Sequence, residues 1–371
     1  MITLSQFGNE LYTGQRSYPI VPRRKVWFTI AVVAMLISAI VLGTRGLNPG
    51  IEFRGGTEFT ISGTADTSGD DARSVLKDAG VNEPPRVSTV GADTIRVQSE
   101  NIPVTDGQTS GEALRAVRDA LASAYDVPAD QVTSTSVGPS WGADVSKKAL
   151  QGLGIFLILV TIVMALYFRA WRMGLAAILA LIHDVIVTIG VYAVVGFEVT
   201  PASVIGLLTI LGYSLYDTVV VFDKVRENTQ DLFEQRRWTY EERANLAVNQ
   251  TFVRSINTSV VGILPVASIL FFGAFLLGAG TLRDIALALF IGMIISTASS
   301  IFIATPLEVV FRNREARIRE HTLQVKSIRG EIEEDATQEE SVVAVSSGGA
   351  AVIPGHHRGN RHQPRKKKGR S

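Results

Sequence analysis

The segment "GYSLYDTVVVFDKVREN" (Gly212–Asn228) begins inside a long apolar run and ends in ordinary water-soluble sequence. Asp217 lies in its apolar part, ahead of the charges that begin at Asp223. A carboxylate among valine, leucine and tyrosine side chains is costly in a membrane unless it has a partner or a proton. The segment therefore predicts a membrane-spanning helix that carries a functional acid and leaves the membrane near Phe222.

Working outward from this segment, five more apolar runs of about 20 residues are long enough to cross a hydrocarbon core of about 30 Å. The six runs cover approximately residues 26–42, 150–168, 175–195, 202–222, 255–277 and 285–311. The 371 residues are 46% hydrophobic and only 19% charged, which suits a membrane protein better than several soluble domains. The sequence predicts a polytopic α-helical membrane protein with six transmembrane helices. We expect the first run to be a retained helix rather than a signal peptide, because it is long and lacks a small-residue cleavage site.

These runs divide the chain into soluble and membrane parts. The predicted division is an N-terminal segment 1–25, a first helix 26–43, an outer domain 44–146, five further helices within 149–311 that include a charged loop 223–254, and a disordered tail 312–371. Lysine and arginine near helix ends favour the cytoplasmic side. They place both termini and the 223–254 loop in the cytoplasm, and the 44–146 domain outside. Lys147 and Lys148, at the outer end of the second helix, count against this orientation.

The outer region has the pattern of a small α+β domain. Strand-like and helix-like stretches alternate in the order β-α-β-β-α-β, at approximately residues 56–63, 69–80, 85–90, 93–99, 111–126 and 131–139. That order is the ferredoxin-like arrangement. No carboxylate–histidine set or nucleophile motif occurs in this region, so we expect an interaction surface there.

Asp217 has polar neighbours at helical spacing. Thr209, Tyr213, Ser214 and Tyr216 lie within two turns of it, and Gly206 and Gly212 would let another helix approach closely. The alternative, a carboxylate that reaches the membrane surface, is less favoured because the aspartate side chain is short.

Two further groups place charge inside the apolar runs. Arg254, near the start of the fifth helix, is expected at a depth comparable to that of Asp217, where contact between the two would lower the pKa of the carboxylate. Arg254 could instead be a positive anchor at the membrane surface. His183 and Asp184 lie near the middle of the third helix. A buried Asp184 needs a partner or a proton, and His183 could be a neutral core residue.

The sequence lacks the residues that several classes of chemistry require. The chain has no cysteine, which excludes disulfides and thiolate chemistry, and it shows no glycine-rich nucleotide-binding loop. We therefore predict a transport protein rather than an enzyme, with no cofactor, no metal and no nucleic-acid partner. The basic end of the tail could attract anionic lipid, contact ribosomal RNA or aid topology. Four of the five histidines are scattered along the tail, at His321, His356, His357 and His362.

The segment quoted first resembles the fourth-helix motif of the SecD/SecF family of protein-export membrane proteins. His183–Ser214 looks like the third-to-fourth-helix region of that family, and Leu282–Leu307 resembles its sixth helix. "GIEFRGGTEFTI" (Gly50–Ile61) resembles its glycine-glycine element after the first helix. The likeness covers about residues 20–315.

The resemblance implies half of a transporter of the resistance-nodulation-division superfamily, in the cytoplasmic membrane of a bacterium. It implies a partnership with SecD and association with the SecYEG channel, and it allows YajC as a further partner. It also implies SecA-driven export of unfolded preproteins that is assisted by the proton-motive force. Asp217 and Arg254 would then contribute to a proton pathway, to which we add Asp184 from the residues themselves. The chain departs from the family pattern at Tyr216, where asparagine is usual, and at Glu52, where aspartate is usual beside Gly55, Gly56 and Thr57.

Two other functions stay open from the sequence. One is a proton-coupled exporter of small molecules or lipids from the same superfamily, although such chains usually contain two repeats. The other is a structural assembly factor in which Asp217 and Arg254 are kept for packing.

Overall fold

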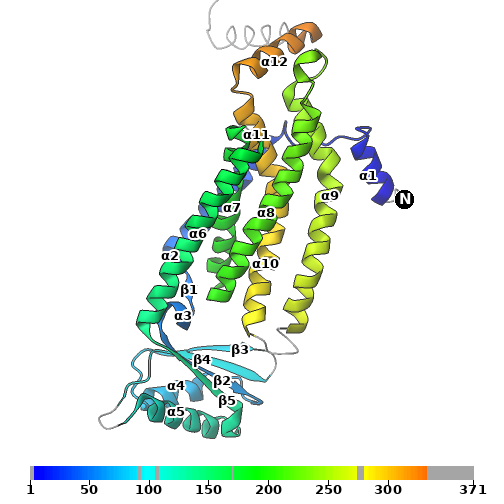
Figure 1. Cartoon of the computed structure of the whole chain (residues 1–371). Helices are drawn as coiled ribbons and strands as arrows, with labels where there is room; N and C mark the ends of the chain where they lie inside the picture. The colour runs from blue at the N-terminus through cyan, green and yellow to red at the C-terminus, as the bar shows by residue number, and fades with distance from the viewer. Residues whose placement is uncertain (1–3, 91–92, 105–107, 169, 274–279, 332–371) are drawn as a thin grey trace, which may run out of the picture.

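The computed structural model describes residues 4–331, except 91–92, 105–107, 169 and 274–279. Within these residues six helices are long and apolar enough to cross a membrane, which confirms the predicted six-span architecture. They run side by side in Figure 1. They are α2 (Arg24–Arg45), α6 (Pro139–Phe168), α7 (Trp171–Val195), α8 (Pro201–Asn228), α9 (Tyr240–Ser268) and α10 (Gly280–Ser299). Helix α9 ends in the π-helical turn η3 (Ile269–Gly273), and α10 continues through a second π-helical turn, η4 (Ser300–Ala304), into α11 (Thr305–Arg312).

A four-stranded antiparallel sheet lies at one end of the bundle, at the bottom of Figure 1. Its strand order β3-β4-β2-β5 is that of a ferredoxin-like domain, as the sequence predicts. Its core is apolar, with Phe59 and Ile61 of β2 packed among residues of both helices. Its elements are β2 (Gly56–Ser62), α4 (Asp70–Asp78), β3 (Arg86–Val90), β4 (Thr94–Ser99), α5 (Ser110–Ala124), the 3-10 turn η1 (Ala129–Gln131) and β5 (Val132–Val137).

The glycine-glycine element connects this domain to the bundle. After α2, the two-residue strand β1 (Asn48–Pro49) pairs in parallel with β6 (Glu198–Val199), which lies between α7 and α8. A short helix, α3 (Ile51–Arg54), follows, and then Gly55 and Gly56 adopt φ angles of 79° and 139°. A Cβ on Gly56 would collide with the carbonyl oxygen of Ser99, so the close approach of β2 to β4 requires glycine here.

Helix α8 is fixed at its start by a capping box between Thr200 and Ser203. Its Gly206 lies against α10, where a Cβ would be 2.9 Å from the Cβ of Ala288. The prediction of close packing is therefore met at Gly206. It is not met at Gly212, which has no atom of another element within 4 Å of its Cβ position among the described residues. Gly212 lies on a face of α8 that this chain leaves uncovered.

The opposite end of the bundle carries α1 (Leu4–Tyr12) and α12 (Ala316–Arg329), as Figure 1 shows. The predicted loop 223–254 consists of the ends of α8 and α9 and a short connection that contains the 3-10 turn η2 (Leu232–Glu234). The predicted disorder from residue 312 is wrong for α12, because Arg329 pairs with Glu242 at 2.7 Å and Ile318 is buried. The rest of the predicted tail, residues 332–371, lies outside the described residues.

Candidate functional site: a row of polar side chains inside the bundle

Asp217 is buried between α8 and the last membrane helix, and only 4% of its surface is exposed. The hydroxyl of Ser300 donates a hydrogen bond to Asp217 Oδ2. Ser300 is the first residue of the π-helical turn η4, and such turns are frequent at functional sites. The widened turn brings a small hydroxyl to a carboxylate that would otherwise face hydrocarbon.

Asp184 forms a second buried carboxylate centre, with 2% of its surface exposed. Ser214 of α8 donates to Asp184 Oδ2 at 2.7 Å, and the Nδ1 atom of His183 lies 3.1 Å from Asp184 Oδ1. Thr188 donates to the backbone carbonyl of Asp184 at 2.7 Å, one turn along α7. Ser214 is thus a hydrogen-bond donor to Asp184 on α7, and not to Asp217 on its own helix.

The two centres are neighbours along α8. Ser214 and Asp217 are three residues apart, which puts them on the same helix face with Cβ atoms about 5–6 Å apart. Beyond Ser300, Thr297 donates to the hydroxyl of Ser259 on α9 at 2.6 Å. Hydroxyls can both donate and accept, and carboxylates can take up a proton. A row of such side chains therefore lies across α7, α8, η4, α10 and α9, in three separate hydrogen-bonded groups.

Arg254 does not lie where the sequence predicts. Asn228 of α8 bonds Gln250 of α9 at 2.9 Å, and the two helices run in opposite directions. Arg254 is therefore displaced from Asp217 by on the order of 10 Å along the bundle axis, toward the α12 end. Its side chain is exposed, and among the described residues no ion pair joins it to Asp217. Both residues stay in the candidate site, but this chain alone does not bring them together.

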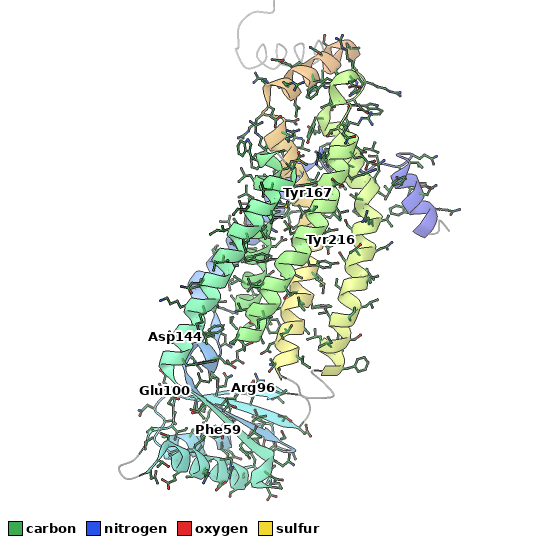
Figure 2. All side chains as sticks on the ribbon, in the orientation of Figure 1. Phe59, Arg96, Glu100, Asp144, Tyr167 and Tyr216 are labelled. Atoms are coloured by element: carbon green, nitrogen blue, oxygen red, sulfur yellow. The ribbon has the colours of Figure 1, made fainter. Side chains whose placement is uncertain are left out.

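The tyrosines beside Asp217 point elsewhere. Tyr216 is 55% exposed on the outside of α8, where Figure 2 labels it, and among the described residues no hydrogen bond joins its phenol to Asp217. Successive residues on a helix are about 100° apart, which turns Tyr216 out when Asp217 turns in. Tyr213 is half-buried and lies against Gly262 of α9.

Ser214 was named from the sequence, whereas Ser300, the hydroxyl partner of Asp217, was missed. Ser296, Thr297, Ser299 and Ser300 form a dense polar patch in an otherwise apolar run, and this density was the available signal. A further buried acid, Glu308, lies nearer the α12 end. It accepts a hydrogen bond of 2.5 Å from Tyr240, while Arg312 lies 3.8 Å away. Among the described residues no cluster of three or more His, Cys, Asp or Glu side chains could hold a metal ion.

The outer-domain motif takes part in a charged contact between the sheet and the bundle. Arg96 of β4 lies 3.4 Å from both Glu58 of β2 and Glu198 of β6. Gln98 donates to Glu58 at 2.8 Å and to Glu198 at 2.5 Å. Burial raises the pKa of Glu52, and the charges of Glu198 and Glu58 raise it further. Glu52 thus adds a third carboxyl group beside one arginine.

Glu52→Gln is expected to make the stability of the folded chain less dependent on pH. Because the folded-state pKa is raised, Glu52 contributes stability at acidic pH, and that contribution is lost as the pH rises through the folded-state value. In thermal unfolding, the variant should be more stable than the native chain at about pH 8, and the gain should shrink toward about pH 5. The matched control, Glu58→Gln, keeps an oxygen that can accept from Gln98 but loses the charge that pairs with Arg96, so it should be less stable at both pH values, on the order of 1 kcal/mol. Equal destabilisation by both variants at pH 8 would contradict the assignment.

The fold and the buried polar row define a class of protein: a multi-pass membrane protein built as one half of a transporter, with a sheet domain between its first two spans. Residues 117–314 match the family described as protein export membrane protein SecD/SecF, C-terminal, and residues 40–65 match the SecD/SecF GG motif. The chain belongs to the SecD/SecF family of protein-export membrane proteins and is an accessory subunit of the Sec protein translocase.

Similar proteins agree with this placement. The protein translocase subunit SecF of Streptomyces coelicolor is 46% identical over 319 residues, covering 86% of this chain and 83% of that protein. SecF of Mycobacterium tuberculosis is 45% identical over 331 residues, covering 86% and 72%. The crystal structure of SecDF, a translocon-associated membrane protein from Thermus thermophilus, aligns with a TM-score of 0.68 at 30% identity. That alignment covers 81% of this chain and 39% of SecDF.

Proposed function

We propose that this subunit works with SecD to draw secreted proteins across a bacterial cytoplasmic membrane, using the proton-motive force. The observation that carries the proposal is the buried row of Asp184, Ser214, Asp217 and Ser300 in a family of export proteins. A proton crossing the membrane field supplies about 2.3 kcal/mol per 100 mV. Asp217 and Asp184 are the groups that would take up and release it.

The uncovered face of α8 supports a partner that supplies a second repeat. Ile205, Thr209, Gly212 and Tyr216 recur every three or four residues and form one exposed stripe; Ile205 is 57% exposed. In transporters of this class the working groups lie between two repeats. The Thermus protein translocase subunit SecDF is a longer chain, of which the matching part is 38%. We propose that SecD packs on the α8 stripe and completes the polar site that Arg254 borders.

Protonation of Asp217 would be transmitted to the sheet domain through the last membrane helix. Ser300 lies just after α10, at the start of η4, and Asp284, in the first turn or two of α10, accepts a hydrogen bond of 3.2 Å from Thr200. The two positions are about 24 Å apart along the helix. Thr200 adjoins β6, whose Glu198 contacts Arg96 in the sheet domain. A shift of α10 when Asp217 gains or loses a proton would therefore move the sheet domain.

The proposed orientation puts the sheet domain outside and both termini in the cytoplasm. Basic residues near the helix ends opposite the sheet favour it, among them Arg24 and Arg172. The α12 end would then face SecA, and the sheet domain would meet preproteins as they leave SecYEG. YajC is a further partner consistent with this placement.

The test of this function combines purification with a secretion assay. The tagged chain, extracted from membranes, is expected to carry SecD and SecYEG with it. Loss of the gene should slow release of a reporter preprotein only while a proton gradient is present. Normal release in cells that lack the subunit, or a purified complex without SecD, would count against the proposal.

A further inference from the structure

A cavity of about 330 Å³ lies between α6, α7 and α8 at the sheet-domain end of the bundle. Its lining is aliphatic where α6 contributes Ala149, Leu150 and Leu153, and where α8 contributes Val204 and Leu207. The volume is at the lower end of the roughly 300–1,000 Å³ typical of small-molecule sites. Leu150, which borders the cavity, is 72% exposed on the outer surface of α6, one of the six candidate membrane spans.

The cavity is separate from the face proposed for SecD. It is lined on α8 by Val204, Leu207 and Leu208, whereas the exposed stripe follows Thr209, Gly212 and Tyr216. These sets lie on different faces of the helix, because successive residues are about 100° apart. A partner helix packed on the stripe would leave the cavity to another occupant.

Two lysines stand at the edge of the cavity. Lys147 precedes Leu150 by three residues, which places it beside the cavity-lining face of α6, and Lys148 follows it. Both are exposed, and Asp144, labelled in Figure 2, lies one helical turn before them. Together with Arg45 at the end of α2 and Arg283 near the start of α10, they oppose the proposed orientation, because lysine and arginine are depleted on the outer side. A local anionic ligand would account for them.

We propose that the cavity holds an acyl chain of an anionic phospholipid, with the lipid phosphate at Lys147 and Lys148. Most of the side chains that line the cavity are apolar, so an acyl chain matches its surface better than a cluster of water molecules does. The headgroup would lie at the membrane surface, where Trp141, 54% exposed, marks the interface. The lipid would fill the space between α6, α7 and α8, next to the sheet domain.

Binding can be measured by native mass spectrometry of the purified full chain in detergent. The probes are phosphatidylglycerol and phosphatidylcholine with identical dioleoyl chains. The native chain is expected to retain phosphatidylglycerol several-fold better. Ala149→Phe and Val204→Phe, which fill the cavity from two helices, should each lose most of the bound lipid. Replacing Lys147 and Lys148 together by glutamine should lower phosphatidylglycerol binding to the phosphatidylcholine level.

Matched controls separate this site from general lipid contact. Ile155→Phe enlarges an outward side chain of the same helix, and Lys77→Gln removes a lysine of the sheet domain. Both should bind lipid as the native chain does. The proposal is overturned if both cavity-filling variants, still monodisperse, retain native binding, or if the native chain does not distinguish the two lipids. Displacement of the lipid by an apolar 20-residue peptide would assign the cavity to a peptide and also overturn it.

Discussion

Asp217→Asn is expected to abolish the proton-driven part of secretion while leaving the subunit folded and assembled. Asparagine has nearly the size of aspartate, and its carbonyl oxygen can still accept the hydrogen bond of Ser300. It cannot take up a proton. Translocation of a reporter preprotein into inverted membrane vesicles should therefore fall to the level seen when the gradient is collapsed, and a protonophore should have no further effect.

The control lies on the same helix. Asp223 is an exposed carboxylate six residues further along α8, and Asp223→Asn should secrete normally. Ser300→Ala keeps the acid but removes its hydrogen-bond donor, so it should slow proton-dependent secretion rather than abolish it. The proton role of Asp217 is excluded if Asp217→Asn secretes at the native rate in cells without another copy.

Much of this site could be predicted because charge is rare inside apolar runs. Asp217 and Asp184 are identifiable from the sequence, since a carboxylate within a membrane span needs a partner. The direction in which each side chain points could not be predicted. A rotation of about 100° per residue decides whether Tyr216 or Asp217 faces α10, and that rotation depends on packing at Gly206. Ser300 was missed because serines also occur in membrane helices without a functional role.

The sheet domain was predicted from the sequence, whereas helix α12 was not. The sheet domain was predictable because alternation within strands and helical spacing between them define a β-α-β-β-α-β order. Helix α12 was missed because its many charges resemble a disordered tail. A stripe of Ile318, His321 and Val325 was nevertheless present, and all three are buried. His321 bonds the carbonyl of Gln235 at 2.7 Å, a contact that no local pattern indicates.

Gly206→Leu is expected to impair folding of the subunit, whereas Gly212→Leu is expected to impair its binding to SecD. The two positions lie six residues apart on α8. At Gly206 a single Cβ would already be 2.9 Å from Ala288 and 3.0 Å from the carbonyl oxygen of Ile285. A leucine must separate α8 from α10, at a cost on the order of 3 kcal/mol, the upper end for overpacked interiors. Little folded Gly206→Leu subunit should be recovered from membranes, and what remains should unfold at lower temperature.

At Gly212 the same substitution meets open space within this chain, so the subunit should fold and unfold as the native one does. If SecD packs on the α8 stripe, however, a leucine there obstructs the approach of its helix, because small residues allow close helix contacts in membranes. Gly212→Leu should therefore lose SecD on copurification, and with it proton-dependent secretion. Gly212→Ala should keep most of both, because its added methyl group is small. A Gly212→Leu subunit that still carries SecD at the native ratio would move the interface away from this stripe, while leaving the buried site of Asp217 and Ser300 untouched.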